Sequence, residues 1–460
     1  MKTGESTLIL FLLAASIAGP GAGQSSPIQW PVPPPGPPRE AALPRILIGV
    51  PAVARALAAG AVVSAIPMDA RGAGPFAAGH LPGAVPGWSA GEEGSEGIGR
   101  LRARLAGLGI SGKEAVVIYG DPDREAVARL YWLLRRAGCA EVHVLDGGLA
   151  AWRAAGRELE TGPPRRAAAP AFHPAASGEE AAADAGWIAG TFAQGGVQLL
   201  DVRDVRGWER WETPPTFAAG HIPYSLPFDP RALLTAGGGW PDPDVVRGYF
   251  ASFGPRPGDP VRLDSTFVLY GEDARDPRLD LGYLLLELAG LHARVFPGGW
   301  KEWTADGGRP VVKVISAREV ADRLRRENPE LAADHPPRNL ILFDLREPRD
   351  FATGHLPGAL SLPFLNFPER FEKAVAAGWP GADRARISLV LYCYGTDCVR
   401  SRKAGAQAAR LGFRNVLWFR GGIQEWREAG YPLLDSALPT PSRSPSPGER
   451  ESPGGGDGRP

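Results

Sequence analysis

Short apolar runs recur along the chain, and polar turns and helix-like stretches separate them. Three runs lead into an Asp-x-Arg motif, at residues 68–71, 200–203 and 343–346. Three later runs each end in a tyrosine, namely Tyr119, Tyr270 and Tyr392. Continuous apolar strands that alternate with helices are typical of a parallel sheet with helices on both faces. The pattern predicts an α/β fold, in which ligands bind beyond the carboxyl ends of the strands.

The same series of motifs occurs three times. A Gly-His-aliphatic-Pro element follows each Asp-x-Arg, with its histidine at His80, His221 and His355. The separation from the aspartate is 11 residues in the first and third copies and 20 in the second, whose insertion contains Trp208 and Trp211. Each copy ends with Gly-Gly-x-x-x-Trp, and its first glycine follows the tyrosine by 28, 28 and 29 residues. This spacing predicts three tandem domains, in which the shared motif residues build the fold.

The repeats and the composition between them set the expected domain boundaries. Domains are expected at residues 45–157, 181–312 and 313–435, with a Pro/Ala-rich linker at 158–180. Residues 24–44 are Pro-rich and predict an extended linker, and 436–460 predict a disordered tail. Residues 1–23 resemble a signal peptide, with Lys2 before an apolar stretch shorter than the ~20 residues that span a bilayer. We therefore expect a periplasmic or secreted protein without a membrane partner.

Charge and cysteine content narrow the chemistry. The chain has 51 basic and 51 acidic residues, a balance that argues against a nucleic-acid partner. No Cys/His cluster has zinc-site spacing, and no phosphate-binding glycine motif occurs, so neither a metal nor a cofactor is expected. Of the three cysteines, Cys139 aligns with Phe413 of the third copy and is expected in the core. The other two, Cys393 and Cys398, follow Tyr392.

The third copy joins Asp-x-Arg, Gly-His-Leu-Pro-Gly, a strand ending in Tyr-Cys, an Arg-Ser helix start and Gly-Gly-x-x-x-Trp. This combination resembles the rhodanese family of sulfurtransferases, in its triple-domain exported bacterial form. The resemblance implies three rhodanese-like domains, each a short parallel sheet flanked by helices. It also implies a catalytic cysteine, which becomes a persulfide, directly after the strand tyrosine. That residue is Cys393 in the third copy, whereas the first two have Gly120 and Gly271 and are expected to be inactive.

We assign the catalytic roles to Cys393 and Arg400. A helix N-terminus and nearby cations favour a thiolate, and the loop amides would stabilise the thiolate and the persulfide anion. Arg400 could bind a sulfonate oxygen, Gly395 would let the loop bend, and a helix is expected from near Ser401. The substrate-binding residues are expected to be Tyr394, Gly395, Thr396, Asp397, Cys398, Val399, Ser401, Arg402 and Lys403.

The predicted function is that of a thiosulfate sulfurtransferase. A small anionic sulfur donor would pass its sulfane sulfur through Cys393 to a thiol or cyanide-like acceptor, or to a sulfur-carrier protein. Six residues separate Cys393 from Arg400, where the family usually has four. The longer loop leaves open a phosphatase-like activity, and a non-catalytic binding or redox-sensing protein is the other alternative. Cys398 is a spectator, a resolving thiol or the sulfur carrier itself.

Overall fold

The computed structural model describes residues 46–435, with gaps at 59–64, 88–96, 122, 176–177, 193–195, 204–219, 235–238, 253–261, 306, 308, 335–339, 366, 380–382 and 397. The predicted signal peptide, Pro-rich linker and tail lie outside the described residues, as do Trp208 and Trp211. Across the described ranges, no helix combines the length and the apolar character needed to cross a membrane.

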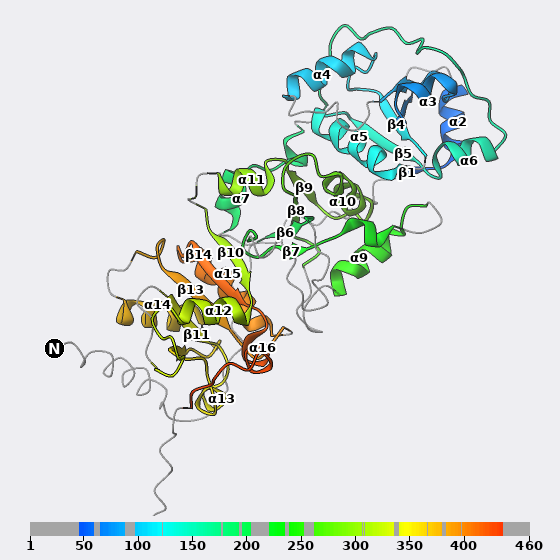
Figure 1. The fold of residues 1–460 in the computed structure, drawn as a ribbon. Helices are drawn as coiled ribbons and strands as arrows, with labels where there is room; N and C mark the ends of the chain where they lie inside the picture. Colours follow the sequence, from blue (N-terminus) through cyan, green and yellow to red (C-terminus); the bar gives the residue numbers. More distant parts are fainter. Residues whose placement is uncertain are drawn as a thin grey trace, which may run out of the picture.

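The chain forms three α/β units in succession, and Figure 1 shows the first in blue and cyan, the second in green and the third in yellow to red. The first contains β1 Leu47–Ile48, α2 Val50–Ala58, β2 Ile66–Asp69, α3 Ala73–Ala78, β3 Val85–Pro86, α4 Ile98–Gly107, β4 Ala115–Tyr119, α5 Arg124–Ala137, β5 Glu141–Leu145 and α6 Gly148–Ala154. The second contains η1 Glu179–Ala181, α7 Ala185–Phe192, β6 Val197–Asp201, β7 Leu226–Pro227, η3 Pro230–Leu233, α9 Pro243–Ser252, β8 Thr266–Tyr270, α10 Pro277–Leu288, β9 Ala293–Phe296 and α11 Gly299–Thr304. The third contains β10 Val311–Ile315, α12 Ala317–Leu324, β11 Leu340–Asp344, α13 Pro348–Ala352, β12 Ala359–Ser361, α14 Phe367–Gly378, β13 Ser388–Tyr392, α15 Val399–Arg410, β14 Asn415–Phe419 and α16 Gly422–Glu428.

Each unit is built on a parallel sheet, which confirms the predicted fold class. The strand orders are β1-β5-β4-β2-β3 in the first unit and β10-β14-β13-β11-β12 in the third. The second has the described order β7-β6-β8-β9. In the second unit, Ala182 forms an isolated parallel bridge with Val295 of β9. This bridge occupies the position that the outer strands β1 and β10 have in the other two sheets. In all three, the Asp-x-Arg strand and the tyrosine strand are neighbours, so both motifs end at the same edge.

The third sheet is covered by helices on both faces. Alternate side chains of β11 and β13 point to opposite sides, as the twofold period of a strand requires. Ile341 and Leu391 pack on one face, with α14 and α15. Leu342 and Val390 pack on the other, with α12 and α16. Burial on both faces explains why the strands are continuously apolar in sequence.

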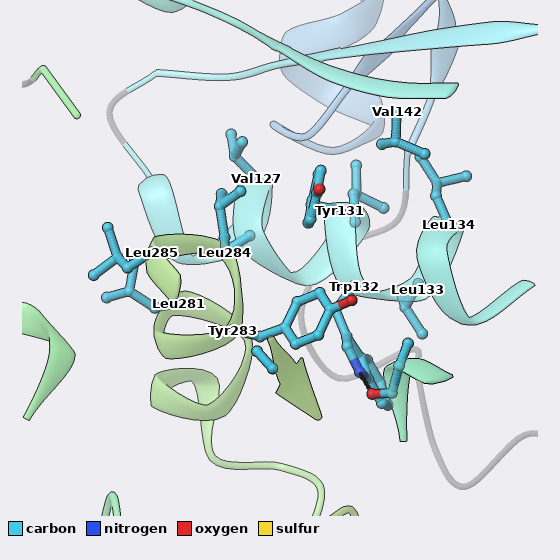
Figure 2. Close-up of a cluster of buried hydrophobic side chains, with 14 of the residues drawn as sticks. Val127, Tyr131, Trp132, Leu133, Leu134, Val142, Leu281, Tyr283, Leu284 and Leu285 are labelled. Carbon is cyan, nitrogen blue, oxygen red and sulfur yellow. Dashed lines mark hydrogen bonds between the residues drawn. The ribbon is translucent and has the colours of Figure 1, made fainter. Parts of the chain in front are cut away.

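The first two domains share one hydrophobic core. Helices α5 and α10 pack against each other, and a single buried cluster contains residues from both sheets. Figure 2 shows Val127 and Trp132 of α5 beside Tyr283 and Leu284 of α10. Within the described residues, the corresponding cluster of the third domain contains no side chain from the other two.

Polar contacts also cross the interface between α5 and α10. Arg129 forms a 3.1 Å ion pair with Asp280, whose side chain is 2% exposed. The indole of Trp132 donates to the carbonyl of Ala181 at 3.0 Å. A buried charge needs a partner, so this ion pair fixes the orientation in which the two helices pack.

The second and third domains are joined through β10. Its residue Val312 pairs with Val416 within the third sheet, and it also exchanges backbone hydrogen bonds with His221 of the second domain. One strand therefore serves both domains. The sheet of the third domain begins at Val311, two residues before the expected boundary at 313.

The predicted linker at 158–180 follows the surface of the first domain. Its backbone N–H groups at Gly162, Ala169 and His173 donate to carbonyls of residues 77, 106 and 111. A Pro/Ala-rich composition alone did not indicate these contacts, because they depend on the shape of the domain already folded.

We expect Leu284→Ala to lower the free energy of unfolding of the first two domains by about 2–5 kcal/mol, because it leaves a cavity in their joint core. Denaturant unfolding followed by tryptophan fluorescence measures the change. Leu365→Ala, at a side chain that is 59% exposed, is the matched control and should shift the transition little. Equal shifts in the two variants would contradict the joint core.

Candidate active site

A buried hydrogen-bond network fixes the carboxyl edge of each sheet. In the third domain, Asp344 accepts hydrogen bonds from Arg346 Nε at 3.0 Å and Nη2 at 2.6 Å. The same Arg346 Nη2 donates to the carbonyl of Gly354, directly before His355. The hydroxyl of Tyr392 accepts the Leu356 N–H at 3.2 Å and also bonds with Asp344. Asp-x-Arg, the strand tyrosine and the Gly-His-Leu-Pro turn thus form one structural unit.

This unit occurs in the domains without a cysteine as well. Arg71 bonds to Asp69 and to the Gly79 carbonyl, as Arg203 does to Asp201 and Gly220. Burial, and next the charge of the aspartate, raise the pKa of Tyr392 well above its ordinary value, so its hydroxyl stays protonated. The Asp-x-Arg pairs have the fold-building role that the sequence predicts.

The histidines of the Gly-His turns hold the chain end of each domain. His80, His221 and His355 exchange backbone hydrogen bonds with residues 160, 312 and 434, after the closing helix. The rings of His80 and His355 also bond to the carbonyls of Phe76 and Phe351 at 3.0 and 3.1 Å. These contacts are the turn-stabilising bonds expected from the sequence.

The closing tryptophans anchor the same segments from the other side. Trp152, Trp303 and Trp426 are buried, and each indole N–H donates to a carbonyl six or seven residues later. The predicted role of the tryptophans as core anchors is confirmed.

The candidate site is the loop from residue 393 to 398, between the end of β13 and the start of α15. Cys393 directly follows Tyr392, and its side chain is 1% exposed. Cys398 is 7% exposed and occupies the N-cap position of α15, whose 12 residues begin at Val399. The N–H groups of that first helical turn have no acceptor within the helix and point toward the loop, where they favour a negative charge. The helix begins two residues before the expected Ser401.

The Gly-Gly turn at the start of α16, Gly421 and Gly422, lies in contact with the loop that contains the two cysteines. Gly422 has a φ of +57°, and a Cβ at this position would lie 2.3 Å from the carbonyl oxygen of Cys393. The Ile423 N–H donates to that oxygen at 3.0 Å, and the Gln424 N–H donates to the Tyr394 carbonyl at 3.1 Å. The start of α16 therefore holds the backbone of the loop, a function that only glycine at 422 permits.

Cys393 and Cys398 form a disulfide, with 6.2 Å between their Cα atoms. The N–H of Cys398 donates to the Gly395 carbonyl at 3.0 Å, which closes a tight turn within the loop. This turn brings the two sulfur atoms together, so the pairing that the sequence left open is compatible with the loop backbone.

Acidic side chains from α13 and the residue before it border the loop. Arg400 Nη1 donates to Glu347 Oε1 at 3.0 Å, and the Tyr394 hydroxyl donates to Asp350. The Tyr394 ring lies 5.9 Å from the guanidinium carbons of Arg346 and Arg400. Sequence reasoning missed both acidic residues. Glu347 directly follows the Asp-x-Arg motif, and only this adjacency in the sequence could have predicted that it lies near the loop.

The remaining predicted binding residues are not all at the loop surface. Ser401 is completely buried, and its Oγ accepts the indole N–H of Trp418 at 3.0 Å. This bond ties α15 to β14 of the sheet. Gly395 is not in the left-handed region, so the bend expected there does not depend on the conformational freedom of glycine. A Cβ at this position would lie 2.9 Å from Oε1 of Gln424, the end of a flexible side chain that can move aside. Thr396 is half-buried, Val399 starts the helix, and Asp397 lies outside the described residues.

Arg402 and Lys403 are half-buried on the first turns of α15. Burial lowers the pKa of His221 to about 3, and the positive charges of Arg203 and Arg402 act in the same direction. His221 pairs with Val312 of β10, and β10 packs against α15, so the Gly-His turn of the second domain lies close to the helix of the candidate site.

The equivalent loops of the first two domains have glycine where the third has Cys393, and a side chain there would be tightly packed. A Cβ at Gly120 would lie 3.1 Å from side-chain atoms of Ala70 and Val127. A Cβ at Gly271 would lie 3.0 Å from the Cβ of Asp276. Cys139, the third cysteine, is buried in the joint core as expected, and burial raises its pKa to about 12. Within the described residues, no group of His, Cys, Asp and Glu could hold a metal ion.

Comparison with known proteins agrees with this architecture. A model of the rhodanese-like domain matches residues 51–155, 184–306 and 317–429. These matches cover most of the chain, so the protein belongs to the rhodanese-like family and contains three tandem copies of its domain.

Individual relatives align with about half of the chain. A Mycobacterium tuberculosis protein that carries the name thiosulfate sulfurtransferase SseB is 32% identical over 247 residues. The alignment covers 51% of this chain and 83% of the relative. A Pseudomonas aeruginosa protein that carries the name 3-mercaptopyruvate sulfurtransferase is 30% identical over 213 residues. The alignment covers 46% of this chain and 72% of the relative. Among solved structures, SseA of Escherichia coli shares 21% identity with a TM-score of 0.42, over 56% of this chain and 99% of that one.

We expect Gly422→Ala to displace the cysteine loop, because its Cβ would collide with the Cys393 carbonyl. The variant should unfold at a lower temperature, and its reduced loop thiols should react faster with a thiol reagent, because a displaced loop exposes the buried cysteines. Gly430→Ala is the matched control, since Gly430 also has a positive φ, of +73°, but open space around it. The free energy of unfolding of this control should fall by about 1–2 kcal/mol, the cost of a left-handed backbone for alanine, and its thiol reactivity should not change. Equal thiol reactivity in the two variants would contradict the role of Gly422.

Proposed function

We propose that the protein is a sulfurtransferase that moves a sulfane sulfur through a persulfide on Cys393. The observation on which the proposal rests is the position of Cys393, between the end of β13 and the N-terminus of α15. The sulfurtransferase names of the two relatives support the reaction class, and they differ in the donor that they name. We take thiosulfate as the donor, as the name of the first relative does, and the helix N-terminus and Arg400 of the loop both favour such an anion.

The proposed first step is attack of the Cys393 thiolate on the outer sulfur of thiosulfate. The bond between the two thiosulfate sulfurs breaks, and its electron pair leaves with sulfite. Cys393 then holds the sulfane sulfur as a persulfide, whose negative charge the N–H groups at the start of α15 would stabilise. A thiol or cyanide-like acceptor attacks the terminal sulfur and regenerates the thiolate.

Arg400 must exchange one anion for another during this step. Its side chain is 30% exposed and paired with Glu347, which is 47% exposed. An ion pair with this exposure is worth about 0–1 kcal/mol, so an entering sulfonate could replace the carboxylate at small cost. Glu347 would then oppose the binding of a dianionic donor.

We propose that the first two domains have no sulfur chemistry of their own. Their glycine positions lack a thiol, and their joint core packs the two domains together. The second domain reaches β10 through His221, and β10 packs against α15, so the second domain would shape the approach to Cys393.

The half-reaction can be tested with the reduced full-length protein and thiosulfate. The wild type should release one equivalent of sulfite, and with cyanide present it should form thiocyanate. Cys393→Ser should do neither, because serine is not nucleophilic enough to accept the sulfur. Cys139→Ala is the matched control and should behave as the wild type. Absence of sulfite from the wild type would overturn the proposal and favour the binding or phosphatase alternatives.

Glu347→Gln should lower the KM for thiosulfate by about 2–5-fold, because it removes the competing charge at Arg400. The effect should shrink as ionic strength rises, since both side chains are partly exposed. Initial rates of thiocyanate formation at low and high salt measure it. Glu141→Gln, the same charge change at a side chain 66% exposed in the first domain, should leave the KM unchanged. An equal decrease in both variants would show a general charge effect only.

A further inference from the structure

We propose that Cys398 is a resolving thiol, which attacks the Cys393 persulfide and releases hydrogen sulfide. The inference rests on the proposed persulfide at Cys393 and adds a second activity to the same site. The protein would reduce sulfane sulfur to sulfide at the expense of its own two thiols, and an external dithiol reductant would restore them.

The geometry needed for this step is present in the loop. The two cysteines already form a disulfide, and the Cys398 N–H to Gly395 carbonyl bond holds the intervening turn. The product of the proposed attack is therefore the bonded state that the structure contains. An intramolecular nucleophile held at this position has a large advantage over one that must enter from solution.

Burial of both sulfurs favours the internal reaction over an external one. Cys393 is 1% exposed and Cys398 is 7% exposed. A large acceptor would need the loop to open before it could reach the persulfide, whereas Cys398 is in contact without any opening.

A comparison of the three domains points to a chemical role for Cys398. The helix after the loop is α5 in the first domain, α10 in the second and α15 in the third. Its N-cap is Asp123 in the first and Asp276 in the second, and both carboxylates accept a backbone N–H of the first turn. The third domain has Cys398 at this position, and its side chain makes no capping hydrogen bond. An N-cap aspartate stabilises a helix by about 1 kcal/mol, so the third domain forgoes this contribution where it places a thiol.

Atoms and electrons balance in the proposed step. The Cys398 thiolate attacks the Cys393 Sγ, and the bond between that Sγ and the sulfane sulfur breaks. The electron pair of the broken bond leaves with the sulfane sulfur, which takes up the proton that the Cys398 thiol gave up and departs as HS⁻. The two cysteines are oxidised to the disulfide, and the sulfane sulfur is reduced to sulfide. A dithiol then reduces the disulfide by thiol exchange and becomes oxidised itself.

A single-turnover experiment tests the proposal. The full-length protein is reduced, freed of reductant without exposure to oxygen and mixed with one equivalent of thiosulfate. Sulfite, sulfide and the intact protein mass are then measured. The wild type should release both sulfite and sulfide, and its mass should fall by two hydrogen atoms. Cys398→Ser should release sulfite but no sulfide, and should gain the mass of one sulfur atom.

Cys398→Ser also separates a chemical role from a structural one. Serine is a good N-cap residue, so the variant should be at least as stable as the reduced wild type, which thermal unfolding measures. With excess dithiol, its steady-state rate of sulfide release should fall by about 100-fold or more, because only external attack remains. Cys139→Ala should match the wild type in every product.

The possible failures are distinguishable. A wild type that releases sulfite and keeps the extra sulfur, without sulfide, would overturn the resolving role and leave the sulfurtransferase proposal intact. Sulfide release from Cys398→Ser equal to that of the wild type would also overturn it. If neither protein releases sulfite, the persulfide proposal itself fails, and the inference fails with it.

Discussion

The buried ion pair between Asp344 and Arg346 determines where the cysteine loop can lie. The carboxylate ends β11 inside the protein, so it must be neutralised there, and Arg346 does this while it also holds the Gly354 carbonyl. Removal of one partner from such a pair costs about 3–5 kcal/mol, because the other charge stays buried. Tyr392, which bonds to the same carboxylate, is the last residue before Cys393. Cys393 is thus attached to the edge of the sheet that this buried network fixes.

Above this edge, backbone contacts rather than side chains shape the loop. Gly422 lies so close to the loop that the next two N–H groups, of Ile423 and Gln424, donate to the carbonyls of Cys393 and Tyr394. The same close approach occurs at Gly148 and Gly299, against the carbonyls of Gly120 and Gly271. Because the frame does not depend on the residue after the tyrosine, two domains could have glycine there and still keep the fold.

The three domains differ mainly in the loop and helix that come after the strand tyrosine. In the first two, aspartates cap the next helix, and the helices pack into a joint core. In the third, a cysteine is the cap, and Arg400 and Glu347 form an ion pair at the loop. The same fold therefore has a capped helix that packs against a neighbouring domain in two copies and a loop with two bonded cysteines in the third.

Much of this organisation could be predicted from the sequence. Continuous apolar strands report burial on both sheet faces, and three motif series with matched spacing report three copies of one fold. The contrast of Cys393 with Gly120 and Gly271 predicts which domain can form a persulfide, because only a thiol can accept sulfur. The nearly uniform apolar character of α10 was a signal of the joint core, since a helix that is hydrophobic on all sides must be covered on all sides.

Only the tertiary structure decided which residues surround the loop. Glu347 reaches Arg400 because α13 follows the β11 edge, and Ser401 turns inward to Trp418 because β14 lies beneath α15. Gly422 is required because the start of α16 presses on a carbonyl 29 residues earlier in the chain. Periodicity along a sequence records which positions are buried, but it does not record which distant residue buries them. That information exists only when the strands and helices have packed together.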